Sequence, residues 1–323
     1  MGYPLTFRPI YQDRVWGGRR LESVFGRVLP EGRVIGESWE VCDRPDAVSV
    51  VANGPAAGRT LRAMMSEDPE GLWGVGATAG MPFPWLCKLL DACDDLSLQV
   101  HPPAGLAASL GGEPKTEMWY VASADPGSCV YAGVQPGTTR ESFAQRAADG
   151  TVAALFHRIP VSVGDVLFLP SGRVHALGRG LVIFEIQQNS DTTYRVFDWN
   201  RVGLDGKPRA LHLEPALASI DFTDTAPALV PREAVLDHGV EVRPLVRHAL
   251  FAIDEVRGGG LVVDRRPAGE VGLVAVVEGV VRFTGGGQTV EVGAGGFVIL
   301  PACLRDLVVD AGAGARWLQV SRG

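Results

Sequence analysis

Residues 164–175 read Gly164-Asp-Val-Leu-Phe-Leu-Pro170-Ser-Gly172-Arg-Val-His175. The apolar run before Pro170 predicts a buried strand, and the Pro-Ser-Gly sequence predicts a tight turn that leads into His175. A related stretch, Gly295-Gly-Phe-Val-Ile-Leu-Pro301, begins 131 residues later, where Asp306 stands in place of the histidine. We therefore expect two similar β-barrels, of which only the first carries a site.

Strand patterns dominate the rest of the chain. Short apolar or alternating runs are bounded by Gly, Pro, Asp and Asn, which is typical of an antiparallel sandwich or barrel. The predicted strands are Ser97–Val100, Trp119–Ala122, Asp165–Leu169, Leu181–Gln187, Tyr194–Phe197, Leu261–Val263, Leu273–Val277, Gly296–Leu300 and Arg316–Val320. The fold class is therefore mainly β, with no alternating βαβ pattern.

Helices are predicted at only three places, so they decorate the strands. The predicted helical segments are Leu61–Met65, a stretch after Pro102-Pro103, and Thr138–Ala148. In the last of these, Thr138 and Glu141 have the spacing of a capping box.

Length and composition bound both the domain count and the function. The 323 residues are 46% hydrophobic and 21% charged, which is typical of a globular protein with up to two domains. A stretch rich in Pro and Asp, residues 220–241, predicts a boundary between domains 1–220 and 221–323. Lys and Arg number 30 against 37 Asp and Glu, so the net charge of −7 argues against nucleic acid or an anionic membrane as partner.

Three polar side chains that could carry chemistry lie on one strand face. In the run from Ser97 to His101, side chains alternate, so Ser97, Gln99 and His101 share one face while Leu98 and Val100 share the other. A polar triplet on one strand face is typical of a wet or metal-filled cavity.

Glu117 and His175 can complete a metal site with His101. Glu117 begins another strand-like run, and His175 follows the Pro-Gly turn. Two imidazoles, one carboxylate and the Gln99 amide oxygen suit Zn²⁺, Mn²⁺ or Fe²⁺, with positions left for water or substrate. The alternative is that His101 and His175 are separate hydrogen-bonded core residues; the polar row and the turn favour ligands.

Longer motifs carry a resemblance to a known family. The run from Gly164 to His175 resembles the second cupin motif, with Arg179 where an Asn often stands. Three further stretches resemble the class I mannose-6-phosphate isomerases in their short bacterial form: Leu96-Ser-Leu-Gln-Val-His-Pro102, Lys115-Thr-Glu117-Met-Trp-Tyr120 and Glu185-Ile-Gln-Gln-Asn-Ser-Asp-Thr-Thr-Tyr-Arg195-Val-Phe-Asp198-Trp199. The likeness covers most of the chain.

The resemblance implies a fold, a metal and a set of site residues. It implies two cupin-like, jelly-roll barrels, the C-terminal one without a metal. By motif position the resemblance places one Zn²⁺ per chain on four ligands, Gln99, His101, Glu117 and His175. It also implies an active-site role for Arg195 and for Lys115, which precedes the metal-binding carboxylate. Ser97 is a further candidate for contact with the substrate phosphate.

The implied activity is the interconversion of mannose 6-phosphate and fructose 6-phosphate. Such a reaction moves a proton between C1 and C2 while charge develops on oxygen, so it needs a base and an electrophile. The motifs leave the base open among Lys115, a metal-bound water, Glu185 and Asp198.

Two other functions remain open from the residues alone. The same two histidines and carboxylate could hold iron in a cupin dioxygenase, although Gln99, Arg195 and Lys115 count against that. A non-catalytic sugar-binding cupin is the third possibility.

The sequence also bears on the cellular location and on the binding partners. The five cysteines form no CxxC pair and the first residues contain no signal-peptide apolar block, so we expect a cytoplasmic protein. The expected partner is a small sugar phosphate, with neither nucleic acid nor membrane, and the chain is expected to be a monomer or a homodimer.

Overall fold

The structure is a computed structural model that describes residues 2–323, and it divides into two compact units. One unit comprises Tyr11–Ser38 and Lys88–Val230; the other comprises the described part of Met1–Ile10 together with Trp39–Cys87 and Pro231–Gly323. Both units combine segments that are distant in sequence. The predicted domains 1–220 and 221–323 concern which parts fold on their own, and that division stays a prediction.

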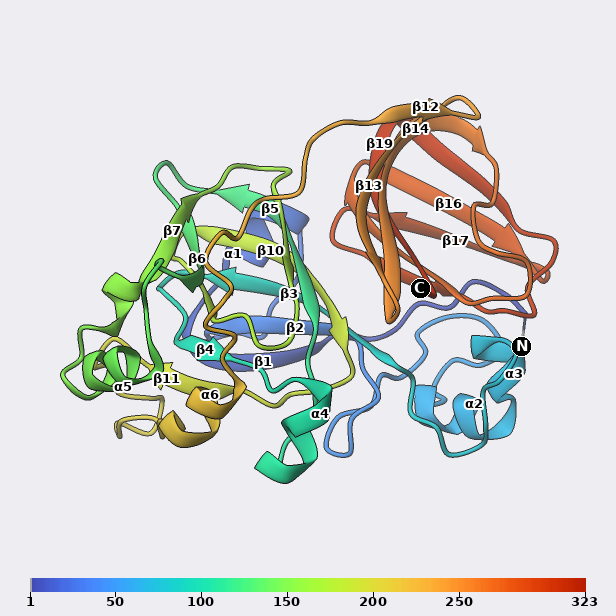
Figure 1. Ribbon diagram of the computed structural model, residues 1–323. Helices are drawn as coiled ribbons and strands as arrows, with labels where there is room; N and C mark the ends of the chain where they lie inside the picture. Colours follow the sequence, from blue (N-terminus) through green and yellow to red (C-terminus); the bar gives the residue numbers. More distant parts are fainter. Residues whose placement is uncertain (1) are drawn as a thin grey trace. The chain divides into compact units, whose positions relative to one another are not determined.

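Two antiparallel sheets build the unit that contains Lys88–Val230 (Figure 1). The six-stranded sheet has the order β1 (Ile10–Gly18), β2 (Ile35–Val41), β3 (Trp85–Ala92), β10 (Leu181–Gln188), β5 (Glu117–Ala124) and β8 (Val166–Leu169). The five-stranded sheet has the order β11 (Tyr194–Phe197), β4 (Leu98–Val100), β9 (His175–Leu177), β6 (Cys129–Val134) and β7 (Phe156–Pro160).

Side chains alternate between the two faces of each strand, so each sheet has an apolar face that packs against the other sheet. Trp119 and Val121 of β5 cluster with Val130 of β6 and Leu177 of β9, so one core forms from both sheets. A second cluster joins β4 and β11 to α5 (Arg140–Ala148) and α6 (Leu213–Ser219) through Phe143 and Ala216. Apolar clusters therefore pack against both faces of the five-stranded sheet.

The remaining helical segments are short. They are α1 (Arg20–Phe25), α4 (Ala104–Ala107) and the 3₁₀ segments η1 (Ala108–Leu110) and η2 (Val152–Leu155) in this unit, with α2 (Leu61–Glu67) and α3 (Pro69–Trp73) in the other.

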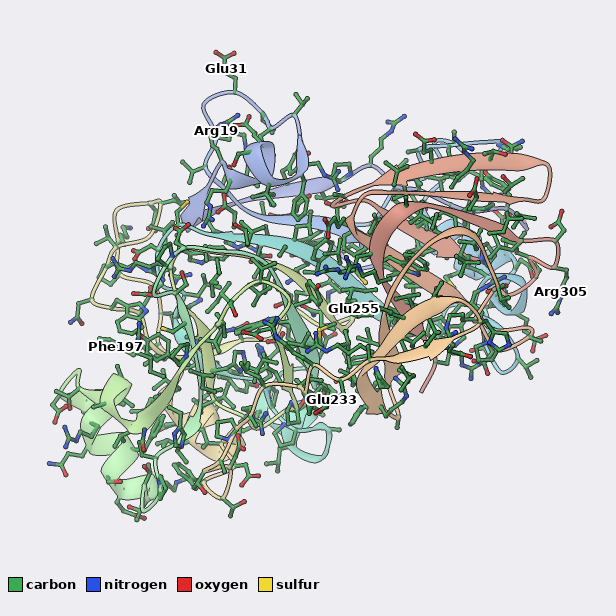
Figure 2. The ribbon with its side chains drawn as sticks, turned by 90° about the horizontal axis from the view of Figure 1, so that it is seen from above. Arg19, Glu31, Phe197, Glu233, Glu255 and Arg305 are labelled. Atoms are coloured by element: carbon green, nitrogen blue, oxygen red, sulfur yellow. The ribbon has the colours of Figure 1, made fainter. Side chains whose placement is uncertain are left out.

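An eight-stranded antiparallel sheet forms the body of the other unit. Its main order is β12 (Val235–Asp237), β13 (Val240–His248), β14 (Phe251–Val262), β19 (Val308–Ser321), β15 (Gly272–Glu278) and β18 (Phe297–Leu300), with β16 (Val280–Gly285) and β17 (Gln288–Gly293) pairing beside β19. Its strands enclose a core around Phe283 and Trp317. In this unit the loop residue Arg305 points away from the sheet, as Glu31 does in the first unit (Figure 2).

The predicted mainly β architecture is confirmed, and the repeat falls on corresponding strands. The apolar runs before Pro170 and Pro301 form β8 and β18. In the second copy the Asp306 carboxylate accepts hydrogen bonds from the Gly286 N–H, at 2.9 and 3.0 Å. The absence of a metal from this part of the chain stays a prediction.

The predicted capping box of α5 is wrong by one residue. The N-cap is Thr139, whose hydroxyl accepts from the Ser142 N–H, while the Ser142 hydroxyl accepts from the Thr139 N–H. The Thr138 N–H donates to the Gln135 carbonyl at 3.1 Å, so Thr138 lies in the preceding turn and the cap moves to Thr139, with Ser142 at the third helical position.

Thr139→Ala is expected to lower the free energy of unfolding by about 1 kcal/mol, because the helix loses its N-cap acceptor. Denaturant unfolding of the two proteins measures this difference. Thr138→Ala is the matched control and should be nearly neutral; an equal loss in both variants would contradict the assignment of the cap.

Across residues 2–323, no helix combines the length and the apolar character needed to cross a bilayer.

Candidate metal centre and its pocket

Three strands bring the predicted metal ligands together. Gln99 lies in β4 and pairs directly with His175, the first residue of β9, while Glu117 begins β5 in the other sheet. The turn before β9 is fixed by Gly172, whose φ of +94° favours glycine and whose N–H donates to the His101 carbonyl at 2.9 Å. His101, Glu117 and His175 are buried, and their candidate ligand atoms lie within 4.8 Å of one another.

Backbone carbonyls fix the tautomer of both histidines. His101 Nδ1 lies 2.7 Å from the Thr192 carbonyl, and His175 Nδ1 lies 2.9 Å from the Arg173 carbonyl. A carbonyl can only accept, so each Nδ1 is the donor and each neutral ring presents the Nε2 lone pair to the cluster. The Glu117 Oε1 lies 3.6 Å from His101 Nε2 and 3.1 Å from His175 Nε2.

This arrangement fits a metal cation. His101 Nε2 and Glu117 Oε1 are buried and have no hydrogen-bond partner among the described residues. Lone pairs that face one another repel unless a cation lies between them, and bonds of about 2.0–2.2 Å in a tetrahedral site put ligand atoms roughly 3.4 Å apart, close to the separations seen. The Gln99 amide Nε2 lies 3.3 Å from His175 Nε2, so rotation of the amide would present its oxygen instead.

Charges around the cluster keep its ligands in their metal-binding forms. Burial would raise the pKa of Glu117, but the Lys115 ammonium, 2.8 Å from Oε2, holds it well below its ordinary value. Burial, with the Lys115 charge, lowers the pKa of His101 to about 3. The carboxylate is therefore ionised and the His101 imidazole neutral at neutral pH.

A second group of charges surrounds Lys88, in the middle of β3. Its Nζ lies 3.5 Å from Glu37 Oε2, 3.4 Å from Glu185 Oε1 and 3.8 Å from Asp191 Oδ1. Burial would lower the pKa of Lys88, but these carboxylates raise it above its ordinary value. Lys88 is therefore a fixed cation.

Glu185 differs from Glu117 because its pKa is raised above the ordinary value. Its Oε2 accepts from the Trp119 indole N–H at 2.8 Å, and its Oε1 also lies 4.0 Å from Lys115 Nζ. Burial raises the pKa of Glu185, and the Glu117 charge adds to that rise, against the lowering effect of Lys115 and Lys88. This carboxyl group can therefore exchange a proton more readily than Glu117.

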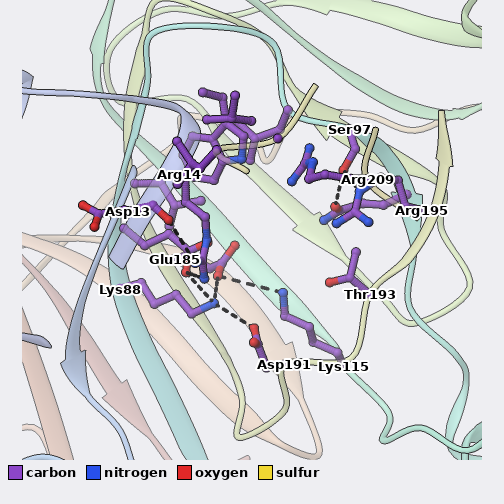
Figure 3. A pocket seen from close by; sticks show the side chains of 18 of the residues that line it. Asp13, Arg14, Lys88, Ser97, Lys115, Glu185, Asp191, Thr193, Arg195 and Arg209 are labelled. Carbon is purple, nitrogen blue, oxygen red and sulfur yellow. Dashed lines mark hydrogen bonds and ion pairs between the residues drawn. The ribbon is translucent and has the colours of Figure 1, made fainter. Parts of the chain in front are cut away.

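A cavity of about 590 Å³ opens beside these groups. Figure 3 shows Ser97, Thr193, Arg195 and Arg209 gathered on one side and Lys88 and Glu185 on the other. Gln99 and Lys115 also line it and connect it to the buried His101–Glu117–His175 cluster. The cavity is thus large enough for a small polar ligand next to the candidate metal centre.

Arg195 brings an uncompensated positive charge to this cavity. It lies opposite Gln99 in the β11–β4 pairing; its Nε donates to Ser97 Oγ at 3.2 Å and its Nη1 to the Ala210 carbonyl at 2.9 Å. Within residues 2–323, no carboxylate forms an ion pair with it. Arg209, by contrast, is bound to Asp198. Arg195 is therefore the guanidinium available to an anion.

The structure brings all seven candidate residues to one place. The candidates Ser97, Gln99, Lys115 and Arg195 line the cavity, and His101, Glu117 and His175 lie beneath them. Their roles remain proposals. Sequence reasoning missed Lys88 and Glu37, although a lone lysine within the apolar run Trp85–Leu90 was a signal.

Asp198 is removed from the proton-carrier candidates by its contacts. Arg209 donates to both of its oxygens and Arg201 to one, at 2.5–3.1 Å. Burial would raise the pKa of Asp198, but the hydrogen bond and charge of Arg209, with Arg201, lower it below its ordinary value. The carboxylate therefore anchors the loop that carries Arg209.

Asp198→Asn is expected to lower the free energy of unfolding at pH 7 by about 1.5–3 kcal/mol, because charge-assisted hydrogen bonds are lost. The pKa of Asp198 is lowered in the folded state. Its contribution to the free energy of unfolding is therefore fully present above the unfolded-state pKa of about 3.9, and it is lost as the pH falls from there through the folded-state pKa. Thermal unfolding of metal-free protein between pH 7 and pH 3 should show the two curves converging. A constant difference would contradict this role.

Comparisons with known proteins agree with this site. The family description "phosphomannose isomerase type I, catalytic domain" matches residues 5–132. The chain is 37% identical over 312 residues to a mannose-6-phosphate isomerase of Streptococcus mutans serotype c (strain ATCC 700610 / UA159), covering 96% of each protein. It is 35% identical over 313 residues to a probable mannose-6-phosphate isomerase of Bacillus subtilis (strain 168), covering 96% of this chain and 97% of the relative.

A solved structure gives the same result for the fold. The crystal structure of the mannose 6-phosphate isomerase from Bacillus subtilis superposes with a TM-score of 0.86 at 29% identity, over 98% of this chain and 99% of that one. Together with the buried His101–Glu117–His175 group, these relationships support a metal cofactor.

Proposed function

The chain belongs to the type I phosphomannose isomerases, and from that premise we propose how its own residues interconvert D-mannose 6-phosphate and D-fructose 6-phosphate. The observation that carries this proposal is the pocket beside the His101–Glu117–His175 cluster, with identity to the isomerases over nearly the full chain. The oxygenase and the non-catalytic cupin are not favoured by these relationships.

We propose that one Zn²⁺ per chain is held by Gln99, His101, Glu117 and His175. Two neutral imidazoles, one carboxylate and one amide oxygen form a borderline nitrogen and oxygen donor set, which suits Zn²⁺. When bound, the cation polarises substrate oxygen and stabilises the negative charge that develops there. The backbone carbonyls on both Nδ1 atoms orient the rings for this task.

Arg195 supplies the positive charge that a sugar phosphate needs in a protein of net charge −7. Its guanidinium has no carboxylate partner among the described residues, and it is held in place by Ser97 Oγ and the Ala210 carbonyl. A planar guanidinium binds phosphate or a developing oxyanion through parallel hydrogen bonds. We assign Ser97 to the same binding group.

Glu185 is the proton carrier that the geometry favours. It lines the pocket, its pKa is raised by burial, and Trp119 fixes one of its oxygens. A carboxylate can take the proton from one of C1 and C2 and return it to the other, provided that its pKa lies near the working pH. Asp198 does not line the pocket and is held by two arginines.

Lys115 acts as a cation, not as the base. The charges of Glu117 and Glu185 raise its pKa against the effect of burial, so its ammonium stays protonated. From that position it can stabilise negative charge on a substrate oxygen and keep Glu117 ionised.

We further propose that the enzyme works in the cytoplasm, as a monomer or a homodimer. Four of its five cysteines are buried or half-buried and Cys93 is exposed, which suits a reducing compartment.

A coupled assay with mannose 6-phosphate tests the function and the metal together. Metal-analysed protein is assayed without oxygen, before and after chelation, and again after Zn²⁺ is added. Formation of fructose 6-phosphate that chelation removes and Zn²⁺ restores supports the proposal. Absence of turnover in protein that contains bound iron would favour the oxygenase, and absence of turnover without any bound metal would favour a binding module.

A further inference from the structure

A second cavity, of about 490 Å³, lies at the end of β5 that is remote from Glu117. It is lined by Arg20, Cys93, Asp95, Asp125, Pro126, Gly127, Ser128, Cys129, Tyr131, Arg158, Arg179 and Gly180. β5 runs from Glu117 to Ala124, and at about 3.3 Å per residue its two ends are roughly 23 Å apart. The cavity is therefore separate from the metal centre and its pocket.

Three arginines outnumber two aspartates in the lining. Arg20 Nη2 pairs with Asp125 at 3.1 Å, and Arg179 Nη2 pairs with Asp95 at 3.0 Å. Arg158 Nη2 donates to the Gly127 carbonyl at 2.9 Å, its side chain also interacts with Cys129, and it forms no ion pair within the described part of the chain. Arg158 is therefore a guanidinium of the lining that no described carboxylate pairs with, although Asp91 lies beside Cys93 and Asp94 lies 3.9 Å from Arg179.

Arg20 contributes a second, independent signal. Its Nη2 donates to Ser123 Oγ and Asp125 Oδ1, but its Nη1 is buried and has no hydrogen-bond partner among the described residues. A buried guanidinium nitrogen without an acceptor is costly, because it has lost its water and gained nothing in exchange. An acceptor from outside the chain would satisfy it.

We propose that this cavity is a binding site for a small dianion of the phosphate class. Arg20 Nη1 and the Arg158 guanidinium supply the charged donors, and the Tyr131 hydroxyl, also in the lining, supplies a neutral one. Asp125 and Asp95 engage Arg20 and Arg179 in ion pairs, so Arg158 and the Arg20 Nη1 are the donors left for an anion.

Cys93 lines this cavity, so the rate at which its thiol is alkylated can report anion binding there. It is the exposed cysteine of the five, and its Sγ lies 3.6 Å from Asp91 Oδ1. Burial and the Asp91 charge raise the pKa of Cys93 to about 11, so its alkylation is slow and sensitive to added negative charge. A dianion bound beside it would lower the thiolate fraction further and screen the sulfur from the reagent.

The test measures the rate of Cys93 alkylation by iodoacetamide, by mass spectrometry of its peptide, as inorganic phosphate is added at constant ionic strength. We expect a saturable slowing of at least threefold. Arg158→Gln should weaken the apparent phosphate affinity tenfold or more, and Arg146→Gln, on the surface of α5, should leave it unchanged. Arg20→Gln provides the same test at the other charged donor.

Three results would overturn the site. They are no slowing by phosphate, equal slowing by chloride at the same ionic strength, and unchanged protection in both Arg158→Gln and Arg20→Gln. Arg195→Ala separates this site from the reaction pocket, because it should keep the protection of Cys93. Loss of protection in that variant would place the phosphate in the reaction pocket and refute a second site.

Discussion

Glu117→Gln is expected to leave the protein without its metal and to reduce kcat/KM by at least about a thousandfold, because metal polarisation supplies several kcal/mol and each 1.4 kcal/mol is a factor of ten. The substitution keeps the size of the side chain but removes the charge between two neutral imidazoles. It also leaves the buried Lys115 ammonium without its partner at 2.8 Å. Removing one member of a buried ion pair costs about 3–5 kcal/mol, so the free energy of unfolding should fall as well.

Metal content by mass spectrometry, kcat/KM and thermal unfolding are measured on the same preparation. Glu233→Gln, at an exposed position outside the helices and strands, is the matched control and should change none of the three. His101→Ala tests the same centre without removing the Lys115 partner, so it separates loss of metal from loss of the ion pair. A Glu117→Gln protein that keeps one metal per chain would show that Glu117 is not a ligand.

The sequence could point to this cluster of candidate ligands because most of the signals are local. Gln99 and His101 share a strand face two residues apart, and His175 follows a turn whose Pro and Gly are visible in the sequence. Strand period and turn chemistry therefore single out three of the four candidate ligands before any tertiary contact is known.

The charges around Lys88 could not be predicted in the same way. Glu37, Lys88 and Glu185 come from β2, β3 and β10, and their proximity depends on the order β2-β3-β10 in the sheet. Nothing in one strand encodes which strand lies next to it, so the lone Lys88 in an apolar run signals a buried charge but not its partners. The second cavity was missed for the same reason, because its arginines lie in α1, β7 and the turn before β10.

Arg195→Ala is expected to keep the metal and to lower kcat/KM by roughly 10²- to 10³-fold, because each lost hydrogen bond to a charged group removes about 1.5–3 kcal/mol. Arg195 touches Ser97 Oγ and the Ala210 carbonyl but none of His101, Glu117 or His175. Its side chain is half-buried and forms no ion pair with a described carboxylate, so the free energy of unfolding should change little. Steady-state kinetics and metal analysis of the purified variant measure both effects.

The split between KM and kcat then decides what Arg195 does. A rise in KM alone means that the guanidinium binds the phosphate equally in the ground state and the transition state, whereas a fall in kcat means that it meets charge that develops during the reaction. Arg195→Lys keeps the charge but not the planar pair of donors, so it should recover only part of the loss. Arg146→Gln serves as the surface control. If Arg195→Ala retained full kcat/KM, the anion-binding role would be refuted, and the phosphate would have to be held by Lys88, Lys115 or Arg209 instead, which are already engaged by carboxylates.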